Sequence, residues 1–127
     1  MTGQTQSASI GSEERTVRIG LDIADLSAEA AYCVPVPCVG YYRQLRSVID
    51  GAVSTANVTI TPSTDAGTIV GGVLTIATAG SGAGDVDSAV PESCPRLVPG
   101  NYLQFTVTGG GAGGSPRGHL IIEIERD

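Results

Sequence analysis

The chain has 127 residues, the size of a single domain, and carries seven arginines, no lysine and thirteen acidic residues, which gives a net charge of −6. A phosphate backbone attracts proteins through their summed positive charge, so this balance argues against a nucleic-acid partner. One histidine, one phenylalanine and no tryptophan leave few groups for catalysis, and no apolar stretch reaches the roughly 20 residues of a membrane span.

The segment 1–14 is polar, rich in small residues and without hydrophobic periodicity. Such a segment cannot bury enough apolar surface to fold alone, so it is predicted to be a flexible N-terminal arm that a partner orders. Ile10 is its candidate contact residue. The first seven residues have neither the basic stretch nor the apolar stretch of a signal peptide, so no secretion signal is expected.

From residue 15 onward the chain is a series of short alternating apolar runs separated by Gly and Pro turns. Side chains on a strand point alternately to opposite faces, so each run predicts a strand with one buried and one wetter face. Such strands with regularly spaced turns are typical of a sandwich or barrel, so 15–127 is predicted to form one all-β domain. Eight strands are expected, near residues 15–23, 30–37, 40–50, 56–62, 67–70, 73–78, 101–108 and 118–126.

The segments between the runs carry turn signals. Gly71-Gly72 predicts a tight hairpin between the two strands on either side of it. Residues 24–31 are the one place where a short helix fits, with Asp25 or Ser27 as its cap. The stretch 79–100 is expected to be a long irregular loop, and loops of that length are usually functional or held by a neighbour.

The three cysteines do not by themselves predict a disulfide. Cys33 and Cys38 flank a Val-Pro-Val-Pro stretch that, when extended, holds their Cα atoms roughly 16 Å apart, beyond the roughly 7 Å limit for a disulfide. Cys94 could pair with either one and leave one thiol free. An odd count without a secretion signal indicates a reducing compartment, and all three are interpreted as buried thiols that pack as small apolar residues.

No combination of polar residues predicts a catalytic or metal site. The three cysteines with His119 have too loose a spacing for a Cys3His zinc site, and residues 82–87 are a single copy of a glycine-aspartate pattern that binds calcium only when stacked. Ser115 and His119 lack a nucleophile elbow and an obvious orienting acid. Glu123 and Glu125 belong to one wet strand face, without partners across a cleft. We therefore expect no enzyme activity, no metal and no cofactor.

The segment 41–46 is the strongest candidate for an interaction site. Tyr and Arg are enriched at interface hot spots because each combines a large contact area with a polar end. On a regular strand Tyr41 and Arg43 share one face, whereas Tyr42 and Arg46 share the other. These four residues are candidate contacts with a partner or with a second copy; the alternative is that the tyrosine rings close the edge of the core.

Several stretches of the chain resemble the head proteins of tailed bacteriophages. They are 16–26, 40–54 with its Ser-Val-Ile-Asp-Gly sequence, the glycine-rich 71–88, and Pro99-Gly100-Asn101-Tyr102-Leu103. In this pattern of strands and turns, the chain after residue 14 is similar to small decoration, or cement, proteins and to the related head-fibre domains. The segment 33–38 and Cys94 depart from the pattern.

The resemblance implies a single-domain β-sandwich or jelly roll of about eight short antiparallel strands with an extended N-terminal arm. It implies a structural protein that binds the major capsid protein on the outer surface of a phage head as a homo-oligomer, commonly a trimer, and stabilises the shell. Such a protein is located on the virion after assembly in the host cytoplasm, without a nucleic-acid or membrane partner. The alternative function is a head-fibre or tail adhesin domain that binds a host surface glycan.

Overall fold

A computed structural model describes residues 15–53, 56–78, 81–109 and 116–127. Within these residues no helix is long and apolar enough to cross a membrane. The arm 1–14 and Ile10 lie outside the described residues, so both remain predictions. The ten strands are β1 (Thr16–Ile23), β2 (Ala30–Pro35), β3 (Gly40–Ile49), β4 (Val58–Thr64), β5 (Val70–Gly71), β6 (Leu74–Ile76), β7 (Val86–Ala89), β8 (Pro91–Ser93), β9 (Tyr102–Thr108) and β10 (Gly118–Arg126).

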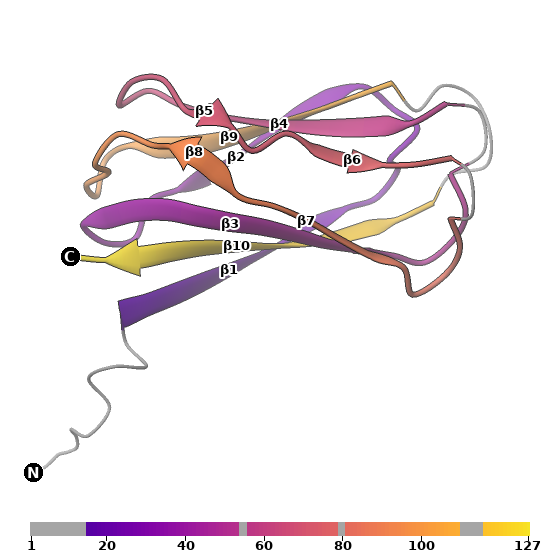
Figure 1. Cartoon of the computed structure of the whole chain (residues 1–127), viewed down its shortest axis with the longest axis horizontal. Coiled ribbons are helices and arrows are strands. Elements are labelled where there is room, and N and C mark those ends of the chain that lie inside the picture. The colour runs from indigo at the N-terminus through magenta and orange to yellow at the C-terminus, as the bar shows by residue number, and fades with distance from the viewer. Residues whose placement is uncertain (1–14, 54–55, 79–80, 110–115) are drawn as a thin grey trace, which may run out of the picture.

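The strands pair antiparallel into two stacked four-stranded sheets and one two-stranded ribbon (Figure 1). One sheet has the order β1-β10-β3-β7, the other has the order β2-β9-β4-β6, and the ribbon joins β5 to β8. When the ribbon is set aside, the first strand pairs with the last, the second with the one before it, and so on inward to β4 with β6. This nested pairing is the topology of a jelly roll, so the predicted all-β sandwich is confirmed.

The core lies between the inward faces of the two sheets. Aliphatic side chains fill it, because alternate residues of each strand point inward. Leu26 and Leu97 complete the core from the connections, at 1% and 0% exposure, and each such side chain contributes roughly 1.5–3 kcal/mol through burial. At Gly40, β3 approaches the end of β10 so closely that a Cβ would overlap the carbonyl oxygen of Glu125.

Most of the predicted strands are confirmed. Those expected near 15–23, 30–37, 40–50, 56–62, 73–78, 101–108 and 118–126 correspond to β1, β2, β3, β4, β6, β9 and β10. The strand expected at 67–70 shares only Val70 with β5, which is two residues long. The helix fitted to 24–31 is absent: the Asp25 carboxylate accepts a hydrogen bond from the Ser27 N–H at 2.9 Å, which folds a turn, and β2 begins at Ala30.

Two predictions about connections are wrong. Gly71-Gly72 does not form a hairpin, because β5 pairs with β8 whereas β6 pairs with β4. With φ of 73° and 77°, these glycines instead lead the chain from the ribbon into the sheet. The stretch 79–100 is not one irregular loop, because it contains β7 and β8, and β7 pairs with the second half of β3 from Leu45↔Ala89 to Val48↔Val86.

Candidate binding faces

A β-bulge in β3 decides which side chains of the segment 41–46 point outward. Glu123 of β10 lies opposite Gln44, and the next residue, Ile124, lies opposite Tyr42, so Arg43 has no partner of its own. A bulge inserts one extra residue into a strand and changes the phase of its alternation. The two halves of β3 therefore alternate independently, one before the bulge and one after it.

As a result, the candidate arginines lie on the same face. Tyr41, Arg43 and Arg46 are exposed, whereas Tyr42 and Leu45 are buried. The interpretation that put Arg43 and Arg46 on opposite faces is wrong because it assumed a regular strand. Tyr41, Arg43 and Arg46 remain candidate contacts, and the bulge places all three on the same outer face.

Tyr42 belongs to the core and is 1% exposed. Its ring meets Phe105 edge to face, with 5.9 Å between the ring centroids. Its hydroxyl is buried without a hydrogen-bond partner among the described residues. Desolvation raises the pKa of this hydroxyl, and the Cys94 thiol adds to the effect. Placing Tyr42 among the surface contacts is therefore wrong, and the alternative of a ring in the core holds for this residue.

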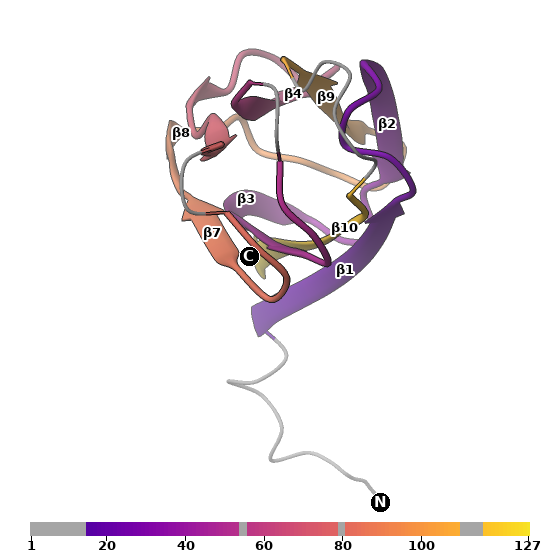
Figure 2. The same cartoon turned by 90° about the vertical axis from the view of Figure 1, so that its right-hand side faces the viewer.

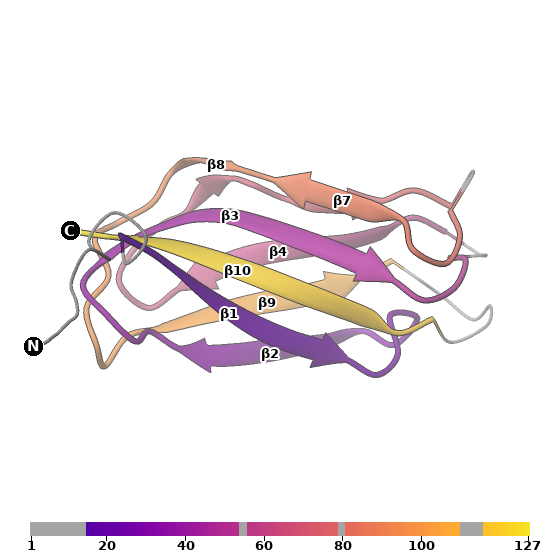
Figure 3. The same ribbon diagram turned by 90° about the horizontal axis from the view of Figure 1, so that it is seen from below.

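Glu123 of β10 is held between arginines from both neighbouring strands, which flank β10 in Figure 3. Arg18 of β1 has its Nε 3.5 Å from Glu123 Oε2, and Arg46 of β3 donates to the same oxygen. The hydrogen bond from Arg46 lowers the pKa of Glu123, and the charges of both arginines act in the same direction, against desolvation. The prediction that Glu123 lies on a solvent-exposed strand face is wrong, because this residue is only 9% exposed beneath its two arginine partners.

A second ion pair lies nearer the end of β10, where Arg43 donates to Glu125. Exposed ion pairs of this kind contribute only about 0–1 kcal/mol to stability, but they hold long side chains in a defined orientation. We call the outer face of the β1-β10-β3-β7 sheet the charged face. Its charged and titratable residues are Arg18, Asp22, Arg43, Arg46, His119, Glu123 and Glu125.

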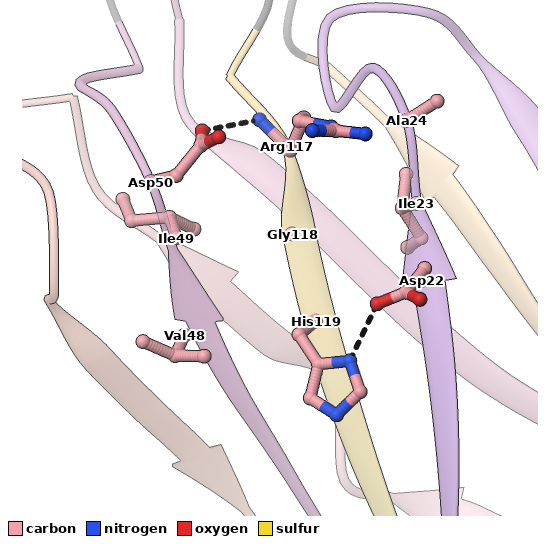
Figure 4. Close-up of a pocket in the computed structure, with 9 residues that line it drawn as sticks. All are labelled: Asp22, Ile23, Ala24, Val48, Ile49, Asp50, Arg117, Gly118 and His119. Carbon is pink, nitrogen blue, oxygen red and sulfur yellow. Dashed lines mark hydrogen bonds and ion pairs between the residues drawn. The ribbon is translucent and has the colours of Figure 1, made fainter.

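An open hollow of about 480 Å³ lies at one end of the charged face, where β1 and β3 end and β10 begins (Figure 4). Aliphatic side chains line it together with Asp22, Asp50, Arg117 and His119. Nδ1 of His119 lies 2.6 Å from Asp22 Oδ1 and donates to it when Asp22 is ionised. Asp50 Oδ1 accepts a hydrogen bond of 2.7 Å from the backbone N–H of Arg117.

The His119–Asp22 pair has the form of a base with its orienting acid, and the sequence analysis did not find that acid. Asp22 lies on β1 and His119 on β10, 97 residues apart, so no local spacing indicates the contact. A catalytic triad also needs a nucleophilic hydroxyl or thiol group, and no residue that lines the hollow has one. Ser115 lies outside the described residues. The hollow is suited to holding a small polar group by hydrogen bonds.

The outer face of the β2-β9-β4-β6 sheet differs completely. Its four strands contain no charged residue in the parts of the chain that the structure describes. Thr59 and Thr108 share a hydrogen bond of 2.7 Å between their hydroxyls, and Thr64 donates to the Tyr102 carbonyl at 2.7 Å. We call this surface the hydroxyl face, after Thr59, Thr61, Ser63, Thr75, Gln104, Thr106 and Thr108.

The three cysteines are free thiols in different surroundings. Cys33 is exposed on the hydroxyl face, so the expectation that all three are buried is wrong for this residue: its position in β2 points outward. Cys38 and Cys94 are half-buried and pack against the core. Burial raises the pKa of the Cys94 thiol, which favours its protonated form. Within the described residues, no three His, Cys, Asp or Glu side chains are grouped to hold a metal ion.

No protein-family model matches this chain, and no curated protein is detectably similar to it. The functional argument therefore depends on the fold and on the surfaces described above.

Proposed function

We propose that this chain is a non-catalytic binding protein that acts through its charged face. The observation that carries the proposal is the β-bulge, which brings Tyr41, Arg43 and Arg46 onto one face. Glu123 and Glu125 hold the two arginines at one end, and each guanidinium has further N–H donors for a partner's carboxylates. Arginines held in this way lose less side-chain entropy on binding than free ones, which favours affinity.

Within that class, we propose a capsid decoration protein of a tailed bacteriophage. The resemblance of the strands and turns from Thr16 onward supports this function, as does the jelly roll, a fold used both in viral capsids and in lectins. In this role the chain binds the major capsid protein on the outer surface of the head, as a closed oligomer such as a trimer. It is a virion component, assembled in the host cytoplasm, and it binds neither nucleic acid nor membrane.

Weak individual contacts are sufficient for such a function. A trimer that engages several shell subunits converts its later contacts into intramolecular ones, which increases avidity by about 10²–10⁴. A protein that binds only the assembled shell also stabilises it by mass action, by about 2.7 kcal/mol per site when its free concentration is 100 times the Kd.

The test uses phage heads assembled without this protein. Saturating them with the purified chain should raise the temperature at which the shells are disrupted, measured by release of the packaged DNA. Bovine serum albumin at the same concentration controls for non-specific protection. Equal heat resistance of saturated and bare shells would overturn the proposal.

The hollow beside His119 favours one alternative, an adhesin domain that binds a host surface glycan. Asp22, Asp50 and Arg117 offer the hydrogen-bonding groups that sugar hydroxyls require. However, no Tyr, Phe or Trp lines the hollow, and ring stacking usually contributes to sugar binding. Binding of host-cell polysaccharide that is abolished by His119→Ala, without any effect of the protein on shell stability, would favour the adhesin.

A further inference from the structure

One side of the sandwich carries a row of exposed valines. It is the side where the β5-β8 ribbon and the β6 and β7 edges lie, opposite the β1 and β2 edges (Figure 2). Val86 and Val90 are 65% and 62% exposed, and Val70 and Val73 are 45% and 47% exposed. We call the surface formed by these four residues, on β5, on β7 and on the connections after them, the valine side. Contiguous exposed apolar residues of this kind mark interaction surfaces.

The two chain segments that carry the valine side, one around β5 and the other around β8, lie against each other. Val70 of β5 pairs with Ser93 of β8, and Gly71 pairs with Pro91. A Cβ added to Gly72 would lie 3.0 Å from the Cα of Pro91, so the chain before Val73 is in contact with the chain after Val90. The four valines therefore lie on neighbouring segments along one side of the sandwich.

The first half of β7 has the reverse of the pattern that an isolated sandwich requires, whereas its second half has the usual one, with Ser88 exposed and Ala89 packed on the core. Its Val86 points outward at the position opposite Val48, whereas Asp87 lies opposite the buried Ser47. A shift of one residue in the pairing would bury the valine and expose the acid. Because the register instead leaves the apolar residue outside, the outer surface of β7 has the character of a surface that is covered in the functional assembly.

The surroundings of Val90 favour a second copy of the same chain as the covering partner. Val90 projects between two hollows, one of about 310 Å³ that contains Tyr41, Arg43 and Glu92, and one of about 210 Å³ that contains Arg43 and Glu125. The same patch thus offers a projecting side chain, recesses to receive one, and charges of both signs. A contact between identical copies needs this complementarity of a surface to itself.

Charge restricts where two copies of this chain can meet. Each chain carries a net charge of −6, so two copies repel each other except where their meeting surfaces are neutral. In a cyclic oligomer the residues nearest the axis meet their own counterparts, which is unfavourable for like charges and favourable for valines.

We propose that the valine side is the contact between copies of this chain in a closed cyclic oligomer, with Val86 and Val90 nearest the axis. The inference rests on the oligomer within the proposed function but not on attachment to a shell. β7, at the edge of the valine side, also belongs to the β1-β10-β3-β7 sheet, so association at this side places the charged faces of the copies around a common axis.

The test is the mass of the full chain in solution at micromolar concentration, by size exclusion with light scattering. The wild type should have a mass that is a multiple of 12.8 kDa, and the double variant Val86→Asp with Val90→Asp should have the monomer mass. The control variant Thr61→Asp with Ser63→Asp adds the same charge on the hydroxyl face and should keep the wild-type mass. Circular dichroism checks that each variant is folded.

If the aspartates prevent folding, Val86→Ser with Val90→Ser removes the apolar surface without adding charge and should also give a monomer. A monomeric wild type, or folded valine variants with the wild-type mass, would overturn the inference. Shell binding is measured separately. If the valine variants are monomeric but the wild type does not protect shells, the oligomer contact is supported and the decoration function is rejected.

Discussion

The two outer faces of this jelly roll are built on the same principle and have opposite chemistry. Both sheets bury alternate aliphatic residues against a common core. Outward, one sheet carries the ion pairs of the charged face, and the other carries threonine, serine and glutamine. The aliphatic residues at alternate, inward positions therefore determine the fold. The residues at outward positions can differ in chemistry without changing the packing of the core.

The difference also separates two ways of making a stable sheet surface. On the charged face, Glu123 and Glu125 orient long arginine side chains across three strands. On the hydroxyl face, short side chains bond to each other or to the backbone, as Thr59 does with Thr108. The first surface should respond to pH, salt and charge substitutions, and the second should respond to none of them. Four experiments test this contrast, in order of decreasing expected effect.

The largest effect is expected on attachment to shells. Arg43→Gln with Arg46→Gln removes two positive charges from the charged face and should weaken binding to undecorated heads at least about tenfold, which is about 1.4 kcal/mol. Thr61→Glu with Ser63→Glu changes the net charge equally on the hydroxyl face and should bind as the wild type does. Sedimentation of heads with labelled protein measures both, and equal weakening by the two variants would remove the distinction between the faces.

The next effect concerns the buried carboxylate. Glu123→Ala leaves Arg18 and Arg46 without their shared partner and should lower the free energy of unfolding by about 1–2 kcal/mol. Thr61→Ala, an exposed substitution on the hydroxyl face, should change it by about 0.5 kcal/mol or less. Urea unfolding followed by circular dichroism measures both values. A Glu123→Ala variant as stable as Thr61→Ala would show that the ion pairs do not stabilise the sheet.

A smaller effect is expected from pH. The pKa of Glu123 is lowered in the folded protein from its ordinary value of 4.5, so its ionised form stabilises the fold. This contribution is fully present above pH 4.5 and is lost as the pH falls through the lowered folded value. The difference in unfolding free energy between the wild type and Glu123→Gln should therefore shrink from pH 7 to pH 3. A difference that stays constant over this range would contradict the assignment.

The smallest effect is expected from salt. Arg18 is largely exposed and lies 3.5 Å from its partner oxygen, so Arg18→Gln should lower stability by only about 0.2–0.5 kcal/mol at low ionic strength. The effect should disappear in about 1 M NaCl, where the Debye length is about 3 Å. Thr61→Val on the hydroxyl face should show no such dependence in the same urea titrations. If the loss of unfolding free energy in Arg18→Gln does not change with salt, Arg18 stabilises the fold through packing of its aliphatic stem and not through its charge.

Strong alternation was sufficient to predict the long strands. In β1, and in β10 from Leu120 to Ile124, each inward position holds a large aliphatic residue, so the period of two is visible locally. β7 was missed because Val86 faces outward and small or polar residues face inward, which hides the pattern. The β-bulge at Arg43 leaves no mark in residue type, so the segment 41–46 was identified as a candidate site but divided between two faces.

The contacts between distant strands could not be predicted. Glu123 with Arg18, and His119 with Asp22, join β10 to β1 across about a hundred residues. Their proximity depends on which strands become neighbours, and that follows from the nested pairing of the whole roll. Only the register shows that Glu123 lies between two arginines.

The pairing of β1 with β10 also determines how the domain bears force. β1 is an edge strand, and its first residue, Thr16, lies opposite Glu125 near the end of β10, whereas Ile23 lies opposite Gly118. A pull through the segments before β1 and after β10 therefore acts at one end of the pair and breaks its hydrogen bonds one after another, like a zipper. Tension applied through the two faces is shared among many side chains and strands. The domain should therefore resist force that is applied through its two faces better than force that is applied through the segments before β1 and after β10.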